Sequence, residues 1–477
     1  MKRNRRVKIL ATLGPASQSK ETIRALHDAG ADVFRINMSH ADHDLMRKLV
    51  ADIRSIEEDV GRPIGILGDV QGPKHRLGVF KDGPVAVEPG HEIVFDLDDA
   101  PGDAKRVNLP HPEIVAALKP GHRMLINDGK VQLTVTEQGE GWVKARVDAG
   151  TELSDRKGVN LPDSELDTGA LTDKDKADIA ALLEAGVDWL ALSFIQRPDD
   201  MAEARKLARG RAGLLAKIEK PQAVERLDEI IELSDAIMVA RGDLGVEMPL
   251  QAVPAIQKRM IRRARAAGKP VVVATQMLES MISSPVPTRA EVSDVATAVY
   301  EGADAVMLSA ESAAGDYPVE AVSTMNSIAE SVETDTLYRD ILMAQRPQAE
   351  ATGADAISFA AGQIASTLNL AAVVCYTASG STGLRAARVR PDTPIMALSP
   401  VRATARRLAL VWGMTCIVTP DANDLDDMVD RACLLARENG FAKTGERIIV
   451  TAGVPLRTPG ATNMLRIAYV GAHGDSR

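Results

Sequence analysis

The sequence predicts an α/β fold: an eight-stranded (β/α)8 TIM barrel that carries a small inserted β-barrel lid domain and an appended C-terminal α/β domain. Short apolar segments alternate with helical patterns, a long β-rich stretch interrupts this alternation, and a new alternation begins after about Thr352. With 477 residues, the chain is long enough for two or three domains. We expect the barrel at residues 1–71 and 170–345, the lid at 72–169 and the C-terminal domain at 346–477.

Each expected barrel strand is a short apolar run rich in β-branched residues, and a helical pattern separates it from the next. Helices end at Gly30, Gly186 and Gly302, where glycine suits the left-handed backbone that often follows a helix. Capping boxes at Thr172 and Thr288 indicate helix starts. The eight barrel strands are expected at Lys8–Thr12, Val33–Asn37, Ile64–Asp69, Trp189–Phe194, Gly213–Ile218, Ala236–Ala240, Pro270–Ala274 and Ala305–Leu308.

The interrupting segment is rich in Gly, Pro and Val and alternates with period two, for example in Val131–Thr136 and Trp142–Val147. Asn127-Asp128-Gly129 is a strong tight-turn signal after the expected strand Met124–Ile126. We expect a lid at the catalytic end of the barrel, because closure over phosphates excludes water. The C-terminal strands are expected at Ala371–Tyr376, Pro394–Leu398, Thr415–Val418 and Arg447–Thr451.

Composition narrows the class of protein. The chain is 45% hydrophobic and 26% charged without a long apolar run, which is typical of a soluble protein with no membrane partner. A net charge of −9 argues against a nucleic-acid partner. The three cysteines lack a CxxC spacing, so we expect free thiols in a reducing cytoplasm rather than disulfides or a zinc site. The basic start reads as a solvated tail, because Lys8 interrupts the apolar run that follows it.

Four polar clusters follow expected barrel strands, and strand ends are where such barrels build active sites. Their carboxylates, lysine, arginine and hydroxyls suit metal-dependent phosphoryl transfer. Lys217 and Glu219 are two apart on a strand, so both side chains point the same way. The residues alone favour two interpretations equally: a salt bridge between Lys217 and the acids, or a metal site. The clusters are Lys217-Ile218-Glu219, Arg241-Gly242-Asp243, Ala274-Thr275-Gln276-Met277 and Ser309-Ala310-Glu311.

Several segments resemble the signatures of the pyruvate kinase family, and they cover essentially the whole chain in the family's order. The resemblance implies transfer of a phosphoryl group from phosphoenolpyruvate to ADP, giving pyruvate and ATP in the last step of glycolysis. It also implies a cytoplasmic homotetramer. The segments are Ala11–Ser17, Arg35–His40, Val239–Gly245, Ala274–Met281 and Pro287–Glu291.

The resemblance implies a role for each strand-end residue. Glu219 and Asp243 hold Mg²⁺ or Mn²⁺ against phosphoenolpyruvate. Lys217 contacts the phosphoryl group during transfer, and Arg35 bridges the phosphates of both substrates. The backbone N–H of Gly242 suits the substrate carboxylate.

Thr275 lies beside the carbon that receives a proton. A free threonine is a poor acid, so a relayed water with Ser309 and Glu311 is favoured over Thr275 alone, and a purely positioning role stays open. The residues that meet the nucleotide are Asn37, Ser39, His40, Arg76 and Lys157. Without the resemblance, Lys157 would be interpreted as a charged loop residue in contact with solvent.

A departure from the family concerns the monovalent cation, K⁺, that many members need. In the family this cation lies near positions matching Asn37, Ser39, Asp69 and Val70. The K⁺-dependent members resemble Asp-Thr-Lys-Gly-Pro-Glu where this chain has Asp69-Val70-Gln71-Gly72-Pro73-Lys74. We expect the ammonium of Lys74 to replace the cation, so that activity does not require K⁺.

The C-terminal loop that follows Tyr376 is rich in hydroxyls and could cradle a phosphate. The family binds phosphorylated effectors there, often with a basic residue where fructose 1,6-bisphosphate is the effector. Ala378 and Ser381 are not basic, so we expect a different phosphorylated effector or no effector. The alternative interpretation is an ordinary loop of small residues without a ligand. The loop residues are Thr377, Ser379, Gly380, Ser381 and Thr382.

Two other functions compete with a kinase. One is another Mg²⁺-dependent phosphoenolpyruvate or pyruvate barrel enzyme, such as a lyase. Arg76 and Lys157 argue against it, because a lyase has no second phosphate-bearing substrate to enclose. The other is a non-catalytic paralogue that senses effectors, and the presence of Lys217, Glu219, Asp243 and Thr275 argues against it.

Overall fold

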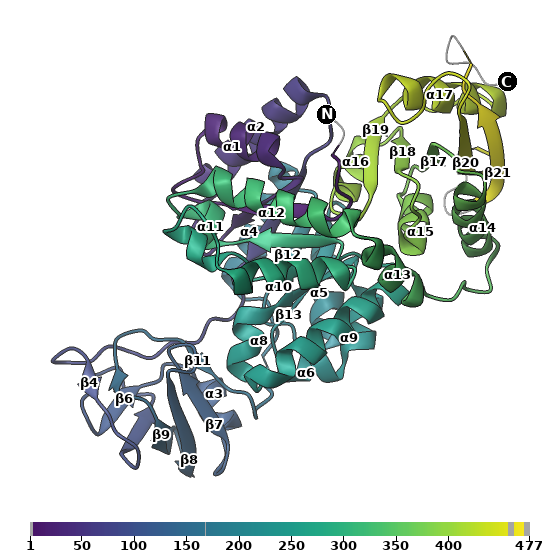
Figure 1. The fold of residues 1–477 in the computed structure, drawn as a ribbon. Coiled ribbons are helices and arrows are strands. Elements are labelled where there is room, and N and C mark those ends of the chain that lie inside the picture. Colours follow the sequence, from purple (N-terminus) through teal and green to yellow (C-terminus); the bar gives the residue numbers. More distant parts are fainter. Residues whose placement is uncertain (1–2, 167, 457–461, 472–477) are drawn as a thin grey trace.

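A closed barrel of eight parallel strands forms the centre of the molecule (Figure 1). The structure, a computed structural model, describes residues 3–166, 168–456 and 462–471. All eight expected barrel strands are confirmed, and the order around the barrel is β1-β16-β15-β14-β13-β12-β3-β2. Their bounds are β1 (Lys8–Leu13), β2 (Val33–Asn37), β3 (Gly65–Val70), β12 (Trp189–Leu192), β13 (Gly213–Ile218), β14 (Ala236–Ala240), β15 (Val271–Ala274) and β16 (Ala305–Leu308).

The barrel strands are buried on both faces, which is why their sequences are continuous apolar runs rather than alternating ones. In β1, Leu10 belongs to the packed barrel interior, whereas Ile9 and Ala11 pack against the outer helices. The surrounding helices are α1 (Lys20–Ala29), α2 (His43–Val60), α4 (Asp173–Ala185), α5 (Pro198–Ala208), α6 (Pro221–Glu225), α7 (Leu227–Leu233), α8 (Arg241–Glu247), α9 (Val253–Ala266), α10 (Arg289–Tyr300), α11 (Ala310–Ala313), α12 (Pro318–Thr334) and α13 (Thr336–Ala344), with the short helices η1 (Leu250–Ala252) and η2 (Glu279–Ile282).

The local signals at the helix ends act as expected. Gly30, Gly186 and Gly302 have φ of 143°, 82° and 87°, which side chains rarely adopt. Thr172 and Thr288 form capping boxes with acidic residues three positions later.

The aspartates at the strand starts join neighbouring strands. Each accepts a backbone N–H from the beginning of an adjacent strand, so these carboxylates, three of them buried and that of Asp235 partly exposed, tie the amino end of the barrel together. The pairs are Asp32 with Ile9 (3.1 Å), Asp188 with Ile66 (2.8 Å), Asp235 with Leu214 (2.8 Å) and Asp304 with Val271 (3.2 Å).

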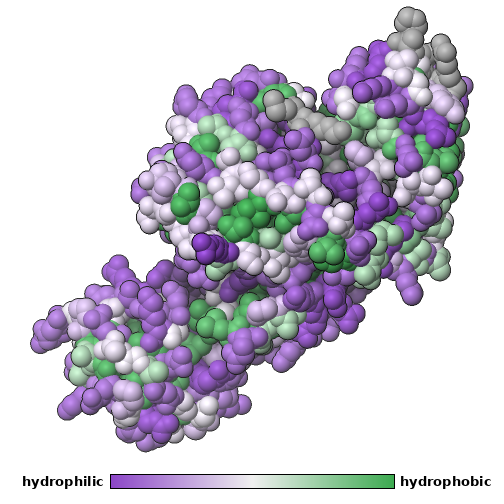
Figure 2. Space-filling model, viewed as in Figure 1, coloured by the Kyte–Doolittle hydropathy of each residue, from purple (hydrophilic) through white to green (hydrophobic). Residues whose placement is uncertain are grey.

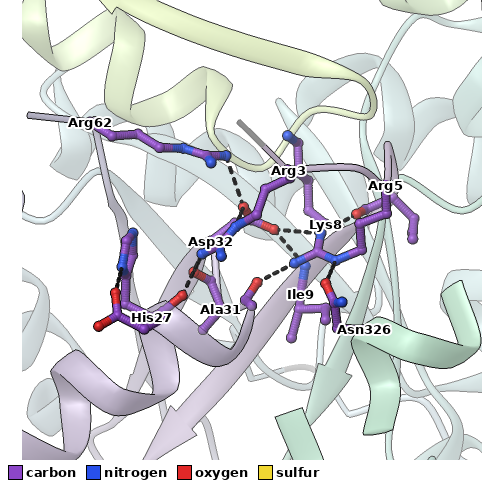
Figure 3. Close-up of polar contacts among 12 residues, drawn as sticks. Arg3, Arg5, Lys8, Ile9, His27, Ala31, Asp32, Arg62 and Asn326 are labelled. Atoms are coloured by element: carbon purple, nitrogen blue, oxygen red, sulfur yellow. Dashed lines mark hydrogen bonds and ion pairs between the residues drawn. The ribbon is translucent and has the colours of Figure 1, made fainter. Parts of the chain in front are cut away.

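Asp32 also contacts cationic side chains from two segments, the N-terminal residues before β1 and the turn after α2 (Figure 3). Its carboxylate lies 2.8 Å from Arg5 NH1, 3.0 Å from Arg62 NH2 and 3.5 Å from Arg3 Nε. Burial alone would raise the pKa of Asp32, but Arg5 and Lys8 outweigh it and hold the pKa well below its usual range. The buried charge is therefore paired, as a stable barrel end requires.

His27, beside this network, provides a test of stability against pH. Burial, together with the smaller effect of the Arg3 charge, lowers the pKa of His27 to about 4. Below pH 6.5 the unfolded chain binds a proton that the folded chain does not, so stability falls as the pH falls towards 4. Between pH 6.5 and 5, we expect the free energy of unfolding to fall by about 2 kcal/mol less in the His27→Gln variant than in the native chain. Thermal unfolding of both proteins across this range checks this, and parallel curves would contradict it.

The insert leaves the barrel after β3 and returns before α4, so it lies at the carboxyl end of the strands (Figure 1). It is an open, curled half-barrel: a six-stranded sheet of order β11-β7-β8-β9-β5-β6 beside the pair β10-β4. The expected turn is present, with φ of 54°, 55° and 78° at Asn127, Asp128 and Gly129. The elements are β4 (Val85–Ala86), β5 (Glu92–Asp96), β6 (Arg106–Asn108), α3 (Pro112–Ala117), β7 (Arg123–Ile126), β8 (Val131–Gly139), β9 (Trp142–Ala149), β10 (Glu152–Leu153) and β11 (Val159–Asn160).

The C-terminal part is a mixed five-stranded sheet of order β19-β18-β17-β20-β21, in which β21 alone is antiparallel. It contacts the amino end of the barrel, where Lys8 Nζ donates to Met414 O at 2.7 Å and Trp412 N donates to Asp304 Oδ1 at 3.1 Å. Insert and C-terminal sheet thus lie at opposite ends of the barrel (Figure 1). The elements are α14 (Gly353–Thr367), β17 (Ala372–Tyr376), α15 (Ser381–Val389), β18 (Ile395–Ser399), α16 (Arg402–Leu408), β19 (Met414–Val418), α17 (Leu425–Glu438), β20 (Arg447–Gly453) and β21 (Thr462–Tyr469).

The surface is mostly hydrophilic, with small separate apolar patches on the face in Figure 2. Leu250, Val286 and Leu337 are exposed singly. Within the described ranges, every helix is too short or too polar to span a membrane. The three cysteines are buried free thiols.

Candidate active site

Lys217 lies at the centre of a buried polar cluster at the carboxyl end of the barrel. It extends from β13, and its Nζ lies 2.7 Å from Ser193 Oγ, 3.0 Å from Glu219 Oε1 and 3.4 Å from Asp69 Oδ1. The side chain of Lys217 is 12% exposed, and those of Asp69 and Glu219 are 1% exposed. The structure therefore brings together three residues that the sequence places on two separate strands.

The cluster fixes the charge of its members. Burial alone would lower the pKa of Lys217, but Asp69 and Glu219 outweigh it and the pKa is raised. Burial alone would raise the pKa of Asp69, but Lys217 and Arg35 hold it below its usual range. Lys217 is thus a preorganised ammonium in a site of low dielectric, where its charge acts strongly on a neighbouring anion.

Glu219 is the member of the cluster that has an oxygen without a hydrogen-bond donor. Its Oε2 accepts the N–H of Phe194 at 2.7 Å, whereas the buried Oε1 has no hydrogen-bond partner, because Lys217 approaches it outside hydrogen-bond geometry. Burial, opposed by the charge of Lys217 and reinforced by that of Asp243, raises the pKa of Glu219 to about 7. Asp243 lies in the first turn of α8, which follows the adjacent strand β14. A buried oxygen without a donor, facing a second carboxylate, fits a divalent cation.

Arg35 links this cluster to a large cleft. Its Nε lies 2.7 Å from Asp69 Oδ2, and NH1 donates to Thr12 Oγ1 at 3.1 Å. The cleft has a volume of about 730 Å³, within the range of small-molecule sites, and Asn37, His40 and Ser309 also line it. Ser39 is exposed beside it, and its backbone N–H donates to Asn37 Oδ1 at 3.0 Å.

Thr275 follows β15 in a strained backbone conformation. Its φ is +72° and that of Gln276 is +54°, values that are unfavourable for residues other than glycine. The Thr275 carbonyl accepts from Arg241 NH2 at 2.6 Å, and its Oγ1 accepts from Gly242 N at 3.0 Å and donates to Ala274 O at 2.6 Å. Gly242 and Thr275 are therefore in direct contact, and Arg241 holds the strained turn.

The predicted lid residues lie at the two chain segments that join insert and barrel, residues 74–78 and 156–159, which we call the hinge. The two segments pair as strands do, with Leu77 N donating to Lys157 O at 2.9 Å. Arg76 is exposed, and its NH1 donates to Arg156 O at 2.9 Å. Lys74 is exposed at a narrow cleft that Lys220 and Asp243 also line.

The monovalent-cation positions are occupied by protein contacts. Asp69 pairs with Arg35 and Lys217, and the Val70 carbonyl accepts the Ser193 hydroxyl at 2.8 Å. Among the described residues, no hydrogen bond or ion pair joins Lys74 to Asn37, Ser39 or Asp69. Replacement of the cation by Lys74 therefore remains a prediction.

The C-terminal loop lies in the other domain, between β17 and α15. Thr377 Oγ1 accepts the N–H of Gly380 at 2.9 Å, Ser379 and Ser381 contact each other at 3.2 Å, and Thr382 bonds Thr462 at 2.8 Å. The hydroxyls of Thr377 and Thr382 are therefore engaged within the loop and with β21.

Three contact residues were not predicted as site members: Thr12, Ser193 and Phe194. Ser193 touches Lys217, Asp69 and the Val70 carbonyl, and Phe194 supplies the N–H that holds Glu219. The sequence prediction extends the fourth barrel strand to Phe194, but β12 ends at Leu192. A polar residue directly after a barrel strand is the signal that would have found Ser193.

A barrel with an inserted half-barrel, and with a buried lysine beside acidic groups at its carboxyl end, is typical of phosphotransferases. The comparisons agree: the sequence matches the family descriptions "Pyruvate kinase, barrel domain" at residues 4–322 and "Pyruvate kinase, alpha/beta domain" at residues 355–468. The chain belongs to the pyruvate kinase family, whose members generally use a divalent metal ion.

Individual relatives span nearly the whole chain. A pyruvate kinase of Methylorubrum extorquens is 61% identical, with 98% of each chain covered. One of Agrobacterium vitis is 49% identical over 98% of this chain and 99% of its own. The crystal structure of a pyruvate kinase from Cryptosporidium parvum superposes with a TM-score of 0.92 at 32% identity, covering 98% of this chain and 96% of that one.

Proposed function

We propose that this protein transfers the phosphoryl group of phosphoenolpyruvate to ADP, giving pyruvate and ATP. The observation that carries the proposal is the buried cluster of Lys217, Glu219, Asp69 and Arg35, in which Arg35 also lines a cleft of about 730 Å³. Membership of the pyruvate kinase family supports the same reaction.

In this reaction an oxygen of the ADP β-phosphate attacks the phosphorus of phosphoenolpyruvate. The bond from phosphorus to the enol oxygen breaks, and its electron pair leaves with the enolate of pyruvate. The ammonium of Lys217 stabilises the negative charge on the transferred oxygens. Arg35, held by Asp69 and Thr12, orients the phosphates, because its planar fork suits oxyanions.

Glu219 and Asp243 would hold Mg²⁺ or Mn²⁺ beside the transferred group. A bound divalent ion neutralises charge on the reacting oxygens as a Lewis acid. Phe194 fixes one Glu219 oxygen by its N–H and leaves the other available as a ligand.

The enolate then takes a proton at its methylene carbon. The Thr275 hydroxyl already donates to the Ala274 carbonyl, which supports a relayed water over Thr275 itself as the donor. Glu311 is buried and accepts the N–H groups of Leu278 and Ser309, which supports a role in ordering such a relay. Positioning of the substrate by Gly242 and Thr275 is the alternative role.

The nucleotide is expected in the large cleft, against Asn37, Ser39 and His40. Arg76 and Lys157, on the two hinge segments, would meet its phosphates when the insert closes. Membership of the family also supports a homotetramer. The loop of residues 377–382 is compatible with a phosphorylated effector other than fructose 1,6-bisphosphate, or with none, because the hydroxyls of Thr377 and Thr382 already have protein partners.

Pyruvate formation with and without ADP tests the proposal. We expect pyruvate from phosphoenolpyruvate and Mg²⁺ only when ADP is present, with one ATP formed per pyruvate. Pyruvate without ADP would favour a lyase or phosphatase, and no turnover under any condition would favour a sensor.

The dependence on K⁺ tests the role of Lys74. We expect the native protein to be fully active in K⁺-free buffer, because a protein ammonium supplies the missing charge. The Lys74→Glu variant should lose at least about tenfold in kcat without K⁺ and recover with added KCl, and Lys81→Glu is the matched control. Native activity that appears only with K⁺ would discard this role of Lys74 and leave the kinase assignment standing.

A further inference from the structure

Two histidines and a glutamate converge at the root of the insert, outside the cluster around Lys217. His75 lies on the outgoing hinge segment, His111 is the N-cap residue of α3, and Glu113 is in the first turn of α3. Glu113 Oε1 lies 3.5 Å from His75 Nε2 and 3.5 Å from His111 Nδ1. All three ligand atoms lie within 4.8 Å of one another.

These distances match the edges of a small coordination tetrahedron. Zinc binds histidine nitrogen and carboxylate oxygen at about 2.0–2.2 Å, which places ligand atoms about 3.3–3.6 Å apart. Two edges already have this length. The side chains of His75, His111 and Glu113 are 12%, 22% and 29% exposed, so they are shielded but retain room to close the third edge.

The electrostatics of the cluster also suit a metal. A neutral histidine ring offers a nitrogen lone pair to a metal, and His75 Nε2 lies 3.5 Å from Glu113 Oε1, within reach of one shared ion. The nearby charge of Lys220 is matched by its ion pair with Glu247. Glu113 supplies a negative ligand between the two rings.

We propose that His75, His111 and Glu113 form a site for a transition metal of the Zn²⁺ class, with a water as the fourth ligand. Two nitrogens and one oxygen select such metals, whereas the oxygen-only pair Glu219 and Asp243 suits Mg²⁺ or Mn²⁺. The chain therefore holds two metal sites of different chemistry.

Occupancy of this site acts on the hinge. His111 Nε2 accepts the N–H of Arg76 at 3.0 Å, so in the metal-free protein the ring proton is on Nδ1. A metal that binds Nδ1 requires the ring proton to move to Nε2, which then faces the Arg76 N–H as a second donor. That hydrogen bond therefore breaks, and both N–H groups turn to water. The metal then links the outgoing hinge segment directly to α3 of the insert, and it restrains the movement of one against the other.

Cobalt(II) absorption provides the test, with the full chain in excess Mg²⁺ so that the oxygen site is occupied. Four-coordinate Co²⁺ with nitrogen ligands absorbs much more strongly than six-coordinate Co²⁺ with oxygen ligands. We expect an intense visible band that saturates at one equivalent and disappears when Zn²⁺ is added. The variants His75→Ala, His111→Ala and Glu113→Gln should each weaken Co²⁺ binding at least about tenfold.

His91→Gln, at an exposed histidine of the insert, is the matched control and should leave the band unchanged. Glu113→Gln preserves the shape of the side chain, so it tests the site even if a histidine variant unfolds. Zn²⁺ should also raise the thermal unfolding midpoint of the native protein and not that of Glu113→Gln. An absent band, or one of equal strength in all three variants, would overturn the proposal whether or not the protein is a kinase.

Discussion

Replacing Lys217 by methionine is expected to lower kcat at least about a thousandfold, while the KM for phosphoenolpyruvate changes less than about tenfold. Lys217 is 12% exposed between Asp69, Glu219 and Ser193, so its ammonium is fixed before the substrate arrives. The charge that it stabilises grows as the phosphoryl group leaves, and its loss therefore affects the transition state more than the bound substrate. Steady-state kinetics with both substrates varied measures the two constants.

The control for this variant is Lys258→Met, at a lysine on α9 that is 54% exposed and pairs with Glu301. It should keep native kcat, because an exposed ion pair contributes little. Native-like circular dichroism of Lys217→Met separates lost catalysis from lost folding. A Lys217→Met variant that turns over within about tenfold of the native rate would show that the ammonium does not stabilise the transfer.

Replacing Glu219 by glutamine is expected to weaken Mn²⁺ binding at least about tenfold and to lower kcat about a hundredfold or more at saturating Mg²⁺. Glutamine has the shape of glutamate and still offers an oxygen to the Phe194 N–H, but it lacks the charge that a divalent ion needs. Electron paramagnetic resonance of free Mn²⁺ gives the affinity in the absence of substrates, and the coupled assay gives kcat.

Glu203→Gln serves as the control for Glu219→Gln. Glu203 is a surface residue of α5 that is 40% exposed and pairs with Lys176, so its replacement should leave Mn²⁺ affinity and kcat unchanged. Equal Mn²⁺ affinity in Glu219→Gln and the native protein would remove Glu219 from the metal site, and the Lys217 prediction would stand on its own.

The barrel could be predicted almost completely from the sequence, because its strands are buried on both faces and read as uninterrupted apolar runs. The curl of the insert could not, since alternation gives each strand but not how far the sheet closes. The last strand, β21, was missed. Its residues alternate poorly between buried and exposed positions, and Leu465 and Arg466 are both only half-buried or exposed. Antiparallel pairing with β20 stabilises it instead of a buried apolar face.

The chemistry of the candidate site could be predicted from residue types, but its pairings could not. Lys217 and Glu219 share a strand face in both the sequence pattern and the structure, whereas the partnership of Lys217 with Ser193 depends on the turn after β12. Phe194 has a φ of +56°, and only this turn aims its N–H at Glu219. Lys74 shows the same limit, because its spacing from Asp69 along the chain does not determine which side of the hinge its ammonium faces.

The central claim, phosphoryl transfer at the strand-end cluster, is tested most directly by phosphorus NMR of phosphoenolpyruvate, ADP and Mg²⁺ with the native protein and with Lys217→Met. We predict that the phosphoenolpyruvate signal of the native sample is replaced by the γ-phosphate signal of ATP, and that the variant sample stays essentially unchanged over the same time. Inorganic phosphate in place of ATP, or equal conversion by both proteins, would contradict the claim.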